Sequence, residues 1–224
     1  MISRKSEVFK YINRGKESVT VLLPGWATEY RIFDALDLNT DYIVPLDFWP
    51  FGFEVALLEA LERYGIKKIS LLGCSMGGFV AAEFASKHRE LTDALTLIGI
   101  RRRYKKDEML DVRRNLKKNR KAYLYKFYNW CFHDAHSVAR FKERLLDDYM
   151  EEFDLDCLLK TLDYLEGCEL RPEALKDIDR IKIIHGEYDR IAPIAEALDV
   201  KNNLPQAEFV TVKGAGHIPL YKHE

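Results

Sequence analysis

One short stretch limits the folds open to this chain more than any other feature. It is Gly73-Cys74-Ser75-Met76-Gly77, an instance of the pattern Gly-x-Ser-x-Gly. The apolar run Ile69–Leu72 precedes it, and a segment with helical spacing follows, which we expect to begin at Gly78. Such a turn lifts the serine hydroxyl above a sheet, and side chains at the two glycines would collide with neighbouring backbone. The bare pattern also fits a strand-to-helix turn with an incidental serine, so partner residues must decide.

Short apolar runs recur along the chain and predict buried strands. They lie at residues 19–23, 42–44, 69–72, 94–98, 181–184 and 209–212. Segments with helical spacing lie between them, marked by Val55, Leu58 and Leu61, by Val80, Phe84 and Ala85, and by Ile194, Ala197 and Leu198. Strands that alternate with helices predict an α/β fold, with a mostly parallel central sheet flanked by helices.

The alternation stops between Arg101 and about Gly167. Helical stripes without strands fill this segment: Leu116, Tyr123, Phe127 and Trp130, then Leu155, Leu158, Leu159, Leu162 and Leu165. We interpret residues 101–169 as an inserted helical cap. Residues 1–100 and 170–224 would then form the core.

Composition excludes several classes of protein. Lys and Arg number 35 against 36 Asp and Glu, so no net positive charge attracts nucleic acid or anionic lipid. The charged opening segment Met1–Glu7 lacks an apolar h-region, and no run is long enough to span a membrane. Four scattered cysteines favour reduced thiols in a cytoplasmic protein. No metal, nucleotide or dinucleotide motif is present, so we expect neither a metal nor a cofactor.

A serine nucleophile needs a base and a group that orients the base. His217 follows the last predicted strand through the glycine-containing loop Lys213–Gly216, and Asp189 follows the strand before it. A lone histidine is more often structural, as we expect for His185, and loop acids usually serve turns. The chain order Ser75, Asp189, His217 nevertheless matches that expected for such an elbow. Together these residues predict a catalytic triad.

The oxyanion of a tetrahedral intermediate needs backbone donors. The expected donors are the N–H after the nucleophile, at Met76, and an N–H after an early strand, at Trp26. Trp26 could equally be a core aromatic residue that packs near the elbow.

Four segments together resemble the α/β-hydrolase family: Pro24-Gly25-Trp26, Gly73–Gly78, Gly186–Pro193 and Gly214–His217. The resemblance implies a serine hydrolase that forms an acyl-enzyme. Two departures are Pro24, where the family usually has histidine, and the end of the chain at Glu224, where a final helix is usual. We expect a monomer or a weak oligomer.

Within that family the chain is most similar to the carboxylesterases of biotin synthesis that demethylate pimeloyl-acyl-carrier-protein methyl ester, notably at Gly25-Trp26 and Glu169–Pro172. That resemblance implies that basic cap residues grip an acidic carrier protein. The candidates are Arg113, Arg114, Lys117, Lys118, Arg120 and Lys121. A charge-rich helix that simply faces solvent is the competing interpretation.

Other functions fit the same residues. The triad could serve a general short-chain carboxylesterase, a thioesterase or a carbon–carbon hydrolase, because fold does not fix the substrate. A catalytically silent relative that only binds a ligand or partner is the alternative outside enzymes. Binding of nucleic acid by the basic cap has less support, because the chain contains no recognisable nucleic-acid-binding module.

Overall fold

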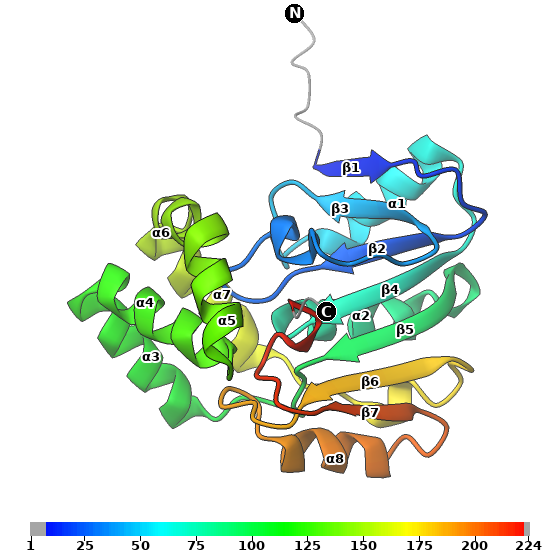
Figure 1. Cartoon of the computed structure of the whole chain (residues 1–224). Helices are drawn as coiled ribbons and strands as arrows, with labels where there is room; N and C mark the ends of the chain where they lie inside the picture. The colour runs from blue at the N-terminus through cyan, green and yellow to red at the C-terminus, as the bar shows by residue number, and fades with distance from the viewer. Residues whose placement is uncertain (1–7, 222–224) are drawn as a thin grey trace, which may run out of the picture.

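The computed structural model describes residues 8–221; the opening segment Met1–Glu7 lies outside this range. A seven-stranded sheet with the order β1-β3-β2-β4-β5-β6-β7 forms its centre (Figure 1). The strands are β1 (Phe9–Ile12), β2 (Val19–Leu23), β3 (Asp41–Pro45), β4 (Ile69–Cys74), β5 (Thr92–Ile98), β6 (Ile181–Gly186) and β7 (Glu208–Val212). Only β1 pairs antiparallel with its neighbour, and the other pairs are parallel. The predicted mostly parallel α/β sheet is confirmed.

The edge strand β1 is absent from the sequence prediction. It is four residues long, and only Phe9 in it is buried, so no continuous apolar run announces it. Its Tyr11 hydroxyl donates a hydrogen bond to Asp41 at the start of β3, at 2.6 Å. An edge strand buries fewer side chains than a central one, and its pattern is correspondingly weak.

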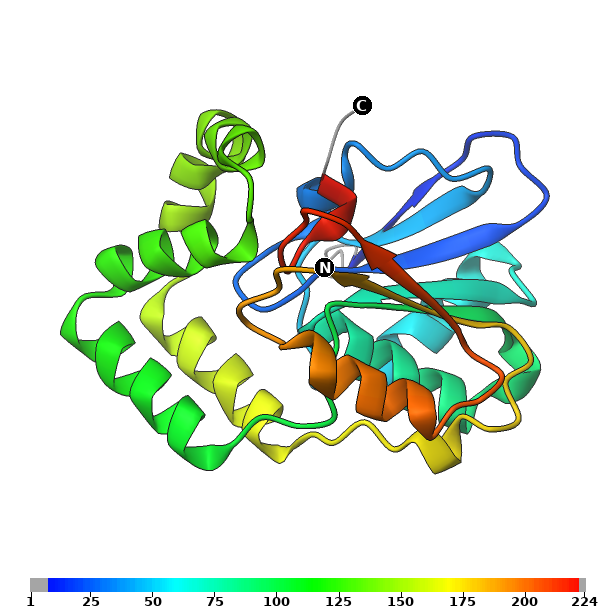
Figure 2. The same ribbon diagram turned by 60° about the horizontal axis from the view of Figure 1, so that its bottom comes forward.

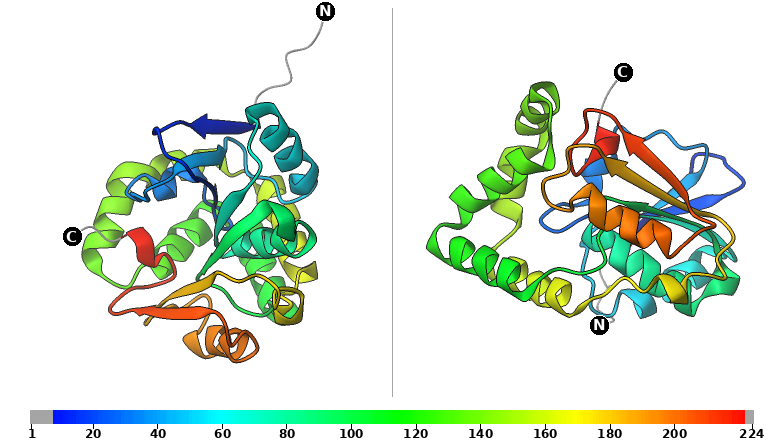
Figure 3. Two further views of the ribbon diagram at one scale, coloured as in Figure 1. Left: turned by 90° about the vertical axis from the view of Figure 1, so that its right-hand side faces the viewer. Right: turned by 90° about the horizontal axis from the view of Figure 1, so that it is seen from below.

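Helices and short turns cover the two faces of the sheet. α1 (Phe53–Tyr64) and α2 (Met76–Lys87) lie on one face, and the 3₁₀ turns η1 (Tyr30–Phe33) and η5 (Pro219–Tyr221) lie on the other (Figure 3). α8 (Ile194–Asn202) packs beside β6. Two further 3₁₀ turns, η2 (Arg89–Leu91) and η4 (Pro172–Ala174), lead into β5 and β6. The helices and turns cover the faces of the sheet but not the carboxyl ends of the parallel strands, where we expect the functional loops.

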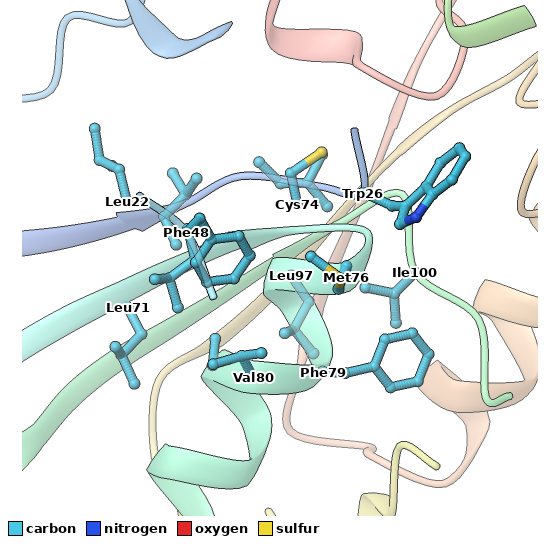
Figure 4. Close-up of a cluster of buried hydrophobic side chains, with 14 of the residues drawn as sticks. Leu22, Trp26, Phe48, Leu71, Cys74, Met76, Phe79, Val80, Leu97 and Ile100 are labelled. Atoms are coloured by element: carbon cyan, nitrogen blue, oxygen red, sulfur yellow. The ribbon is translucent and has the colours of Figure 1, made fainter. Parts of the chain in front are cut away.

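The central helix α2 packs against β4 and β5. Phe79 and Val80 of this helix lie among side chains of the strands and of Ile100, as Figure 4 shows. The helix begins at Met76, two residues before the predicted start at Gly78. The difference arises because the tight turn is completed at Ser75, whose carbonyl already accepts a hydrogen bond from the N–H of Gly78, at 2.9 Å.

The predicted apolar stripe of α1 is partly wrong. Val55 is 62% exposed, whereas Phe53, Leu57 and Leu61 are buried. Positions four apart stay on one face of a helix, while a strict three-residue repeat drifts around it. The buried set follows the four-residue spacing.

Consecutive helices occupy the segment between β5 and β6. They are α3 (Lys106–Lys118), α4 (Arg120–Cys131), α5 (Ala135–Phe141), the π-helical turn η3 (Lys142–Leu146), α6 (Asp147–Glu152) and α7 (Leu155–Gly167). This group, called the cap below, lies over the carboxyl ends of the parallel strands (Figures 1 and 2). Within residues 8–221, no helix has both the length and the apolar character needed to cross a membrane.

Two buried hydroxyl groups tie the cap to the core. Tyr128 of α4 donates to the carbonyl of Ala27 at 2.7 Å, and Tyr149 of α6 donates to the carbonyl of Glu29 at 3.2 Å. Both acceptors belong to the loop that follows β2. Cap position and loop conformation are therefore coupled.

Candidate active site

Ser75 sits at a strained turn between β4 and α2. Its φ of 52° and ψ of −115° are unusual for a residue with a side chain, and such strain persists only where surrounding structure imposes it. A Cβ atom at Gly73 would lie 2.3 Å from the carbonyl oxygen of Gly77, and one at Gly77 would lie 2.3 Å from that of Leu23. Both glycines of the Gly-x-Ser-x-Gly pattern are thus required by close backbone packing.

The loop after β2 lies directly beside this turn. A Cβ atom at Gly25 would be 3.2 Å from Cβ of Ser75, and the next residue, Trp26, lines a cavity together with Ser75. On the other side, Met76 opens α2, and the first N–H groups of a helix have no partner within it. Trp26 and Met76, the two predicted oxyanion donors, therefore flank Ser75.

The Trp26 side chain also has a packing role. It is buried, its ring meets that of Phe127 edge-on at 4.9 Å, and its Nε1–H donates to the carbonyl of Leu158 at 3.2 Å. The two interpretations of Trp26 are compatible, because the side chain holds α4 and α7 while the backbone stays beside the serine.

Asp189 and His217 meet in the interior at the carboxyl ends of β6 and β7. Oδ2 of Asp189 lies 2.7 Å from Nδ1 of His217, and both side chains are almost fully buried. Oδ1 of the same carboxylate accepts hydrogen bonds from the backbone N–H groups of Ile191 and Ala192, at 2.8 and 2.9 Å. The carboxylate is held from both sides, and it orients the imidazole through Nδ1.

Glycines allow the two loops to approach each other this closely. A Cβ atom at Gly186 would lie 1.9 Å from the carbonyl oxygen of Gly216, and one at Gly216 would lie 2.7 Å from that of Cys131, at the end of α4. The N–H of Ile218 donates to the same Cys131 carbonyl at 3.2 Å. The histidine loop is thus wedged between β6 and the cap.

The other nitrogen of the imidazole, Nε2, makes no hydrogen bond to Ser75 or to any other described residue. This nitrogen is buried, and His217 and Ser75 line one small cavity. The Ser75 hydroxyl lies 3.4 Å from the hydroxyl of Tyr104. The structure therefore brings the three predicted triad residues together, with an unpaired nitrogen available to accept a proton.

The surroundings favour an ionised Asp189. Burial raises the pKa of this carboxyl, but the charge and hydrogen bond of His217, the nearby His185 and the N–H of Ala192 outweigh burial, so the net pKa is lowered. His185 is fully buried, its Nε2–H donates to the carbonyl of Ala192 at 2.7 Å, and Nε2 lies 3.4 Å from Oδ2 of Asp189. Burial lowers the pKa of His185. The histidine is buried, as expected, but it is not fully satisfied, because its Nδ1 has no hydrogen-bond partner among the described residues.

A cavity of about 300 Å³ opens beside Ser75. Its walls come from the cap and from the loops after β2, β5 and β6. They include Trp26, Met109, Val112, Tyr123, Phe127, Trp130, Leu162, Leu165 and Ile191, with Arg101, Glu108 and Arg190 as the charged members. The volume and the mostly apolar walls suit a small organic group.

A family model for the alpha/beta hydrolase fold matches residues 49–224. This chain belongs to the α/β-hydrolase family. The hydrolase is 27% identical over 174 residues to the AB hydrolase superfamily protein YisY of Bacillus subtilis, a match that covers 69% of this chain but only 61% of that protein. It is 26% identical over 260 aligned positions to the 2-hydroxy-6-oxononadienedioate/2-hydroxy-6-oxononatrienedioate hydrolase of Paraburkholderia phymatum, covering 93% of this chain and 83% of that one.

Solved structures share the fold of this α/β hydrolase. An esterase from Exiguobacterium antarcticum superimposes with a TM-score of 0.78 at 20% identity, covering 93% of this chain and 87% of that one. A meta-cleavage product hydrolase from Pseudomonas fluorescens gives 0.72 at 16% identity, covering 94% and 86%. At these identities the likeness concerns the fold alone.

The six basic cap residues predicted to bind a carrier protein differ in environment. Arg113 is only 16% exposed at its side chain and forms ion pairs with Asp163 and Glu166 of α7, each at 2.6 Å. Three others have local partners: Arg114 with Asp111, Lys121 with Glu151, and Arg120 with the carbonyl of Phe153. Lys117 and Lys118 have no ion pair within the described part of this hydrolase. Carboxylates therefore pair with three of these six basic residues, Arg113, Arg114 and Lys121.

Two residues near Ser75 were not among the predicted site residues. Tyr104 carries no motif. Arg101 opens the predicted cap segment, but it is 3% exposed and paired with Glu108 and Glu196. Tyr104 and Arg101 are both held at the site by contacts with residues far away in the sequence. The apolar turn Ile98–Ile100, which ends β5 at the sheet edge shared by the triad loops, is the one signal that could have pointed to them.

Proposed function

We propose that this α/β hydrolase is a serine hydrolase of carboxylic esters, with Ser75 as nucleophile, His217 as general base and Asp189 as the group that orients the base. One observation carries the proposal: Nε2 of His217 is unpaired at the cavity shared with Ser75, while Nδ1 is fixed 2.7 Å from buried Asp189. An unassisted serine hydroxyl is a poor nucleophile, and this arrangement supplies the missing base.

In the proposed reaction, Oγ of Ser75 attacks the ester carbonyl and its proton passes to Nε2 of His217. The backbone N–H groups of Trp26 and Met76 stabilise the oxyanion. His217 then gives the proton to the departing alcohol, and water hydrolyses the acyl-enzyme with the same base. Asp189 stays ionised throughout and stabilises the imidazolium.

The mostly apolar cavity beside Ser75 favours a small or medium acyl group. For the finer identity, we propose demethylation of pimeloyl-acyl-carrier-protein methyl ester, a step of biotin synthesis. Support comes from the sequence resemblance and from the unpaired lysines Lys117 and Lys118 on α3, the helix that also supplies Met109 and Val112 to the cavity.

Hydrolysis of a carbon–carbon bond is the second candidate. It is favoured by the similarity to the hydrolase of Paraburkholderia phymatum, whose name specifies a diacid with a 2-hydroxy-6-oxo group. The same triad would serve, and no metal or cofactor is needed in either reaction. A general short-chain esterase or thioesterase would use the same triad without a carrier.

The proposed function is tested by methanol release from pimeloyl-acyl-carrier-protein methyl ester, measured beside a free short methyl ester at several salt concentrations. Ser75→Ala serves as the control in every assay. Fast, Ser75-dependent and salt-sensitive turnover of the carrier-bound ester supports the biotin-pathway proposal. Equal turnover of both esters points to a generalist. If neither ester is hydrolysed but a 2-hydroxy-6-oxo diacid is cleaved in a Ser75-dependent way, carbon–carbon hydrolysis is favoured. Inactivity on all of these substrates would favour a silent binder.

A further inference from the structure

The hydroxyl of Tyr104 is aimed at the candidate nucleophile. Tyr104 lies in the connection between β5 and α3, is 9% exposed, and its oxygen is 3.4 Å from Oγ of Ser75. No other hydrogen bond of this hydroxyl is present among residues 8–221. The proposed mechanism leaves the group unused.

Arg101 holds the Tyr104 ring in this position. The guanidinium carbon lies 4.8 Å from the ring centroid. The guanidinium itself is fixed by a two-pronged contact to Glu196 of α8, at 2.7 and 2.8 Å, and by Glu108 of α3 at 3.0 Å. Bidentate pairs of this kind restrict orientation as well as position. Tyr104 is therefore clamped from both the core and the cap.

The environment keeps Tyr104 protonated. Burial raises the pKa of the phenol above its ordinary value, and the hydrogen bond to Ser75 and the charge of Arg101 only partly offset that rise. A phenol that stays neutral at working pH can donate a hydrogen bond but cannot act as a base. Its partner in reach is the oxygen of Ser75.

We propose that Tyr104 is a further catalytic residue, whose hydroxyl donates a hydrogen bond to Oγ of Ser75 as that oxygen leaves the acyl-enzyme. The inference rests on the proposed ester hydrolysis. In deacylation, water adds to the acyl carbon and gives a proton to His217. The bond between that carbon and Oγ then breaks, its electron pair stays on Oγ, and His217 returns the proton to Oγ. Tyr104 keeps its own proton throughout.

The donor assists departure of Oγ more than attack by Oγ. In the acyl-enzyme, Oγ is an ester oxygen and a weak acceptor, so the hydrogen bond strengthens as negative charge develops. In the free enzyme, Oγ is a hydroxyl oxygen and already a good hydrogen-bond acceptor. The hydrogen bond from Tyr104 therefore stabilises the ground state and the transition state of the attack to a similar extent. Only a gain specific to the transition state accelerates a step. Catalytic hydrogen bonds often shorten on the way to the transition state, so a separation of 3.4 Å is compatible with this role.

Tyr104→Phe tests this proposal in pre-steady-state assays with p-nitrophenyl acetate. We expect the deacylation rate to fall about 10- to 100-fold, while the rate of the initial nitrophenol burst changes less than about threefold. The acetylated protein should then accumulate and be visible by intact mass spectrometry. The matched control is Tyr125→Phe, which removes an exposed cap hydroxyl bonded to Lys142 at 2.8 Å and should leave both rates unchanged.

Two results would overturn the role of Tyr104. One is unchanged deacylation in Tyr104→Phe. The other is an equal loss in both steps, which indicates a displaced serine rather than a lost donor. The rate of inactivation by a fluorophosphonate, which reports attack by Ser75 without deacylation, separates these cases even if the variant is less stable. Absence of any burst or labelling in the parent protein would instead refute the proposed ester hydrolysis itself.

Discussion

Oδ2 of Asp189 lies 2.7 Å from Nδ1 of His217, while Oδ1 of the same carboxylate binds two backbone N–H groups of its own loop. The Asp189 side chain thus orients the candidate base, His217, and stabilises the loop to which Asp189 itself belongs. The two roles use different oxygens, so a substitution can separate them.

Asp189→Asn is expected to retain the fold and lose activity. The amide oxygen can still accept from Ile191 and Ala192, but the NH₂ group would face Nδ1 of His217 and place the imidazole proton on Nε2. Nε2 could then no longer accept the Ser75 proton, and kcat should fall roughly 10⁴-fold. Ester hydrolysis and thermal unfolding are the two measurements. A variant with near-parental kcat would show that Asp189 is not the orienting group.

Gly77→Ala is expected to destabilise the protein severely. Its Cβ atom would lie 2.3 Å from the carbonyl of Leu23 and 2.5 Å from that of Pro24, and backbone atoms cannot move aside as a flexible side chain can. We expect a loss of about 3 kcal/mol or more in the free energy of unfolding. Gly167→Ala is the matched control, because a Cβ atom there meets nothing within 4 Å, and it should change that free energy by less than about 1 kcal/mol. Equal effects in urea unfolding would contradict the packing argument.

His185 is expected to make stability depend on pH. Burial lowers the pKa of His185 in the folded state, although the adjacent Asp189 raises it, and the nearby His217 adds to the lowering. Below about pH 6.5 the unfolded chain therefore binds a proton that the folded protein does not. The free energy of unfolding should fall as pH decreases from 6.5, by up to about 1.4 kcal/mol per pH unit, until the folded pKa is reached.

Urea unfolding between pH 7.5 and 5.0 checks this slope. His185→Gln should flatten it, because the amide NH₂ can still reach the carbonyl of Ala192 but does not titrate. His136→Gln, at an exposed cap position, is the control. If the three proteins share one slope, His185 is not the source of the pH dependence.

Charge reversal at Lys117 and Lys118 tests the carrier-protein proposal. The double change to Glu should lower kcat/KM for the carrier-bound ester about tenfold or more at low salt and leave the free methyl ester unaffected. Lys67 and Lys68 are also exposed and without ion pairs among the described residues, but they precede β4 at the opposite end of the strands from the cap. Charge reversal at both Lys67 and Lys68 should leave kcat/KM for both substrates unchanged. Equal losses in the two double variants would indicate only a long-range charge effect.

The sequence was most informative where burial is complete. β4 and its neighbours are enclosed on both faces, so their residues form continuous apolar runs, and the glycines around Ser75 and His217 mark backbone contacts that leave no room for a side chain. The edge strand β1 left no such run. Placement of Ser75, Asp189 and His217 in neighbouring loops followed from strand order, whereas their catalytic roles stay predictions.

Contacts between segments that are far apart in the sequence could not be predicted from sequence patterns. Tyr104 approaches Ser75 across 29 positions of the chain, and Arg101 finds Glu196 across 95. A basic residue in a basic stretch gives no local sign that it is buried and paired. Arg113 likewise pairs with Asp163 of α7, 50 positions away, and no local pattern indicates that contact.

The most direct test of the central claim is covalent labelling of the purified protein with a fluorophosphonate, followed by peptide mapping. We predict a single adduct on Ser75, formed rapidly by the parent protein, slowed at least about 100-fold in His217→Ala and absent in Ser75→Ala. Labelling at another residue, or labelling of Ser75 at the same rate without His217, would contradict the assignment of Ser75 and His217 as nucleophile and base.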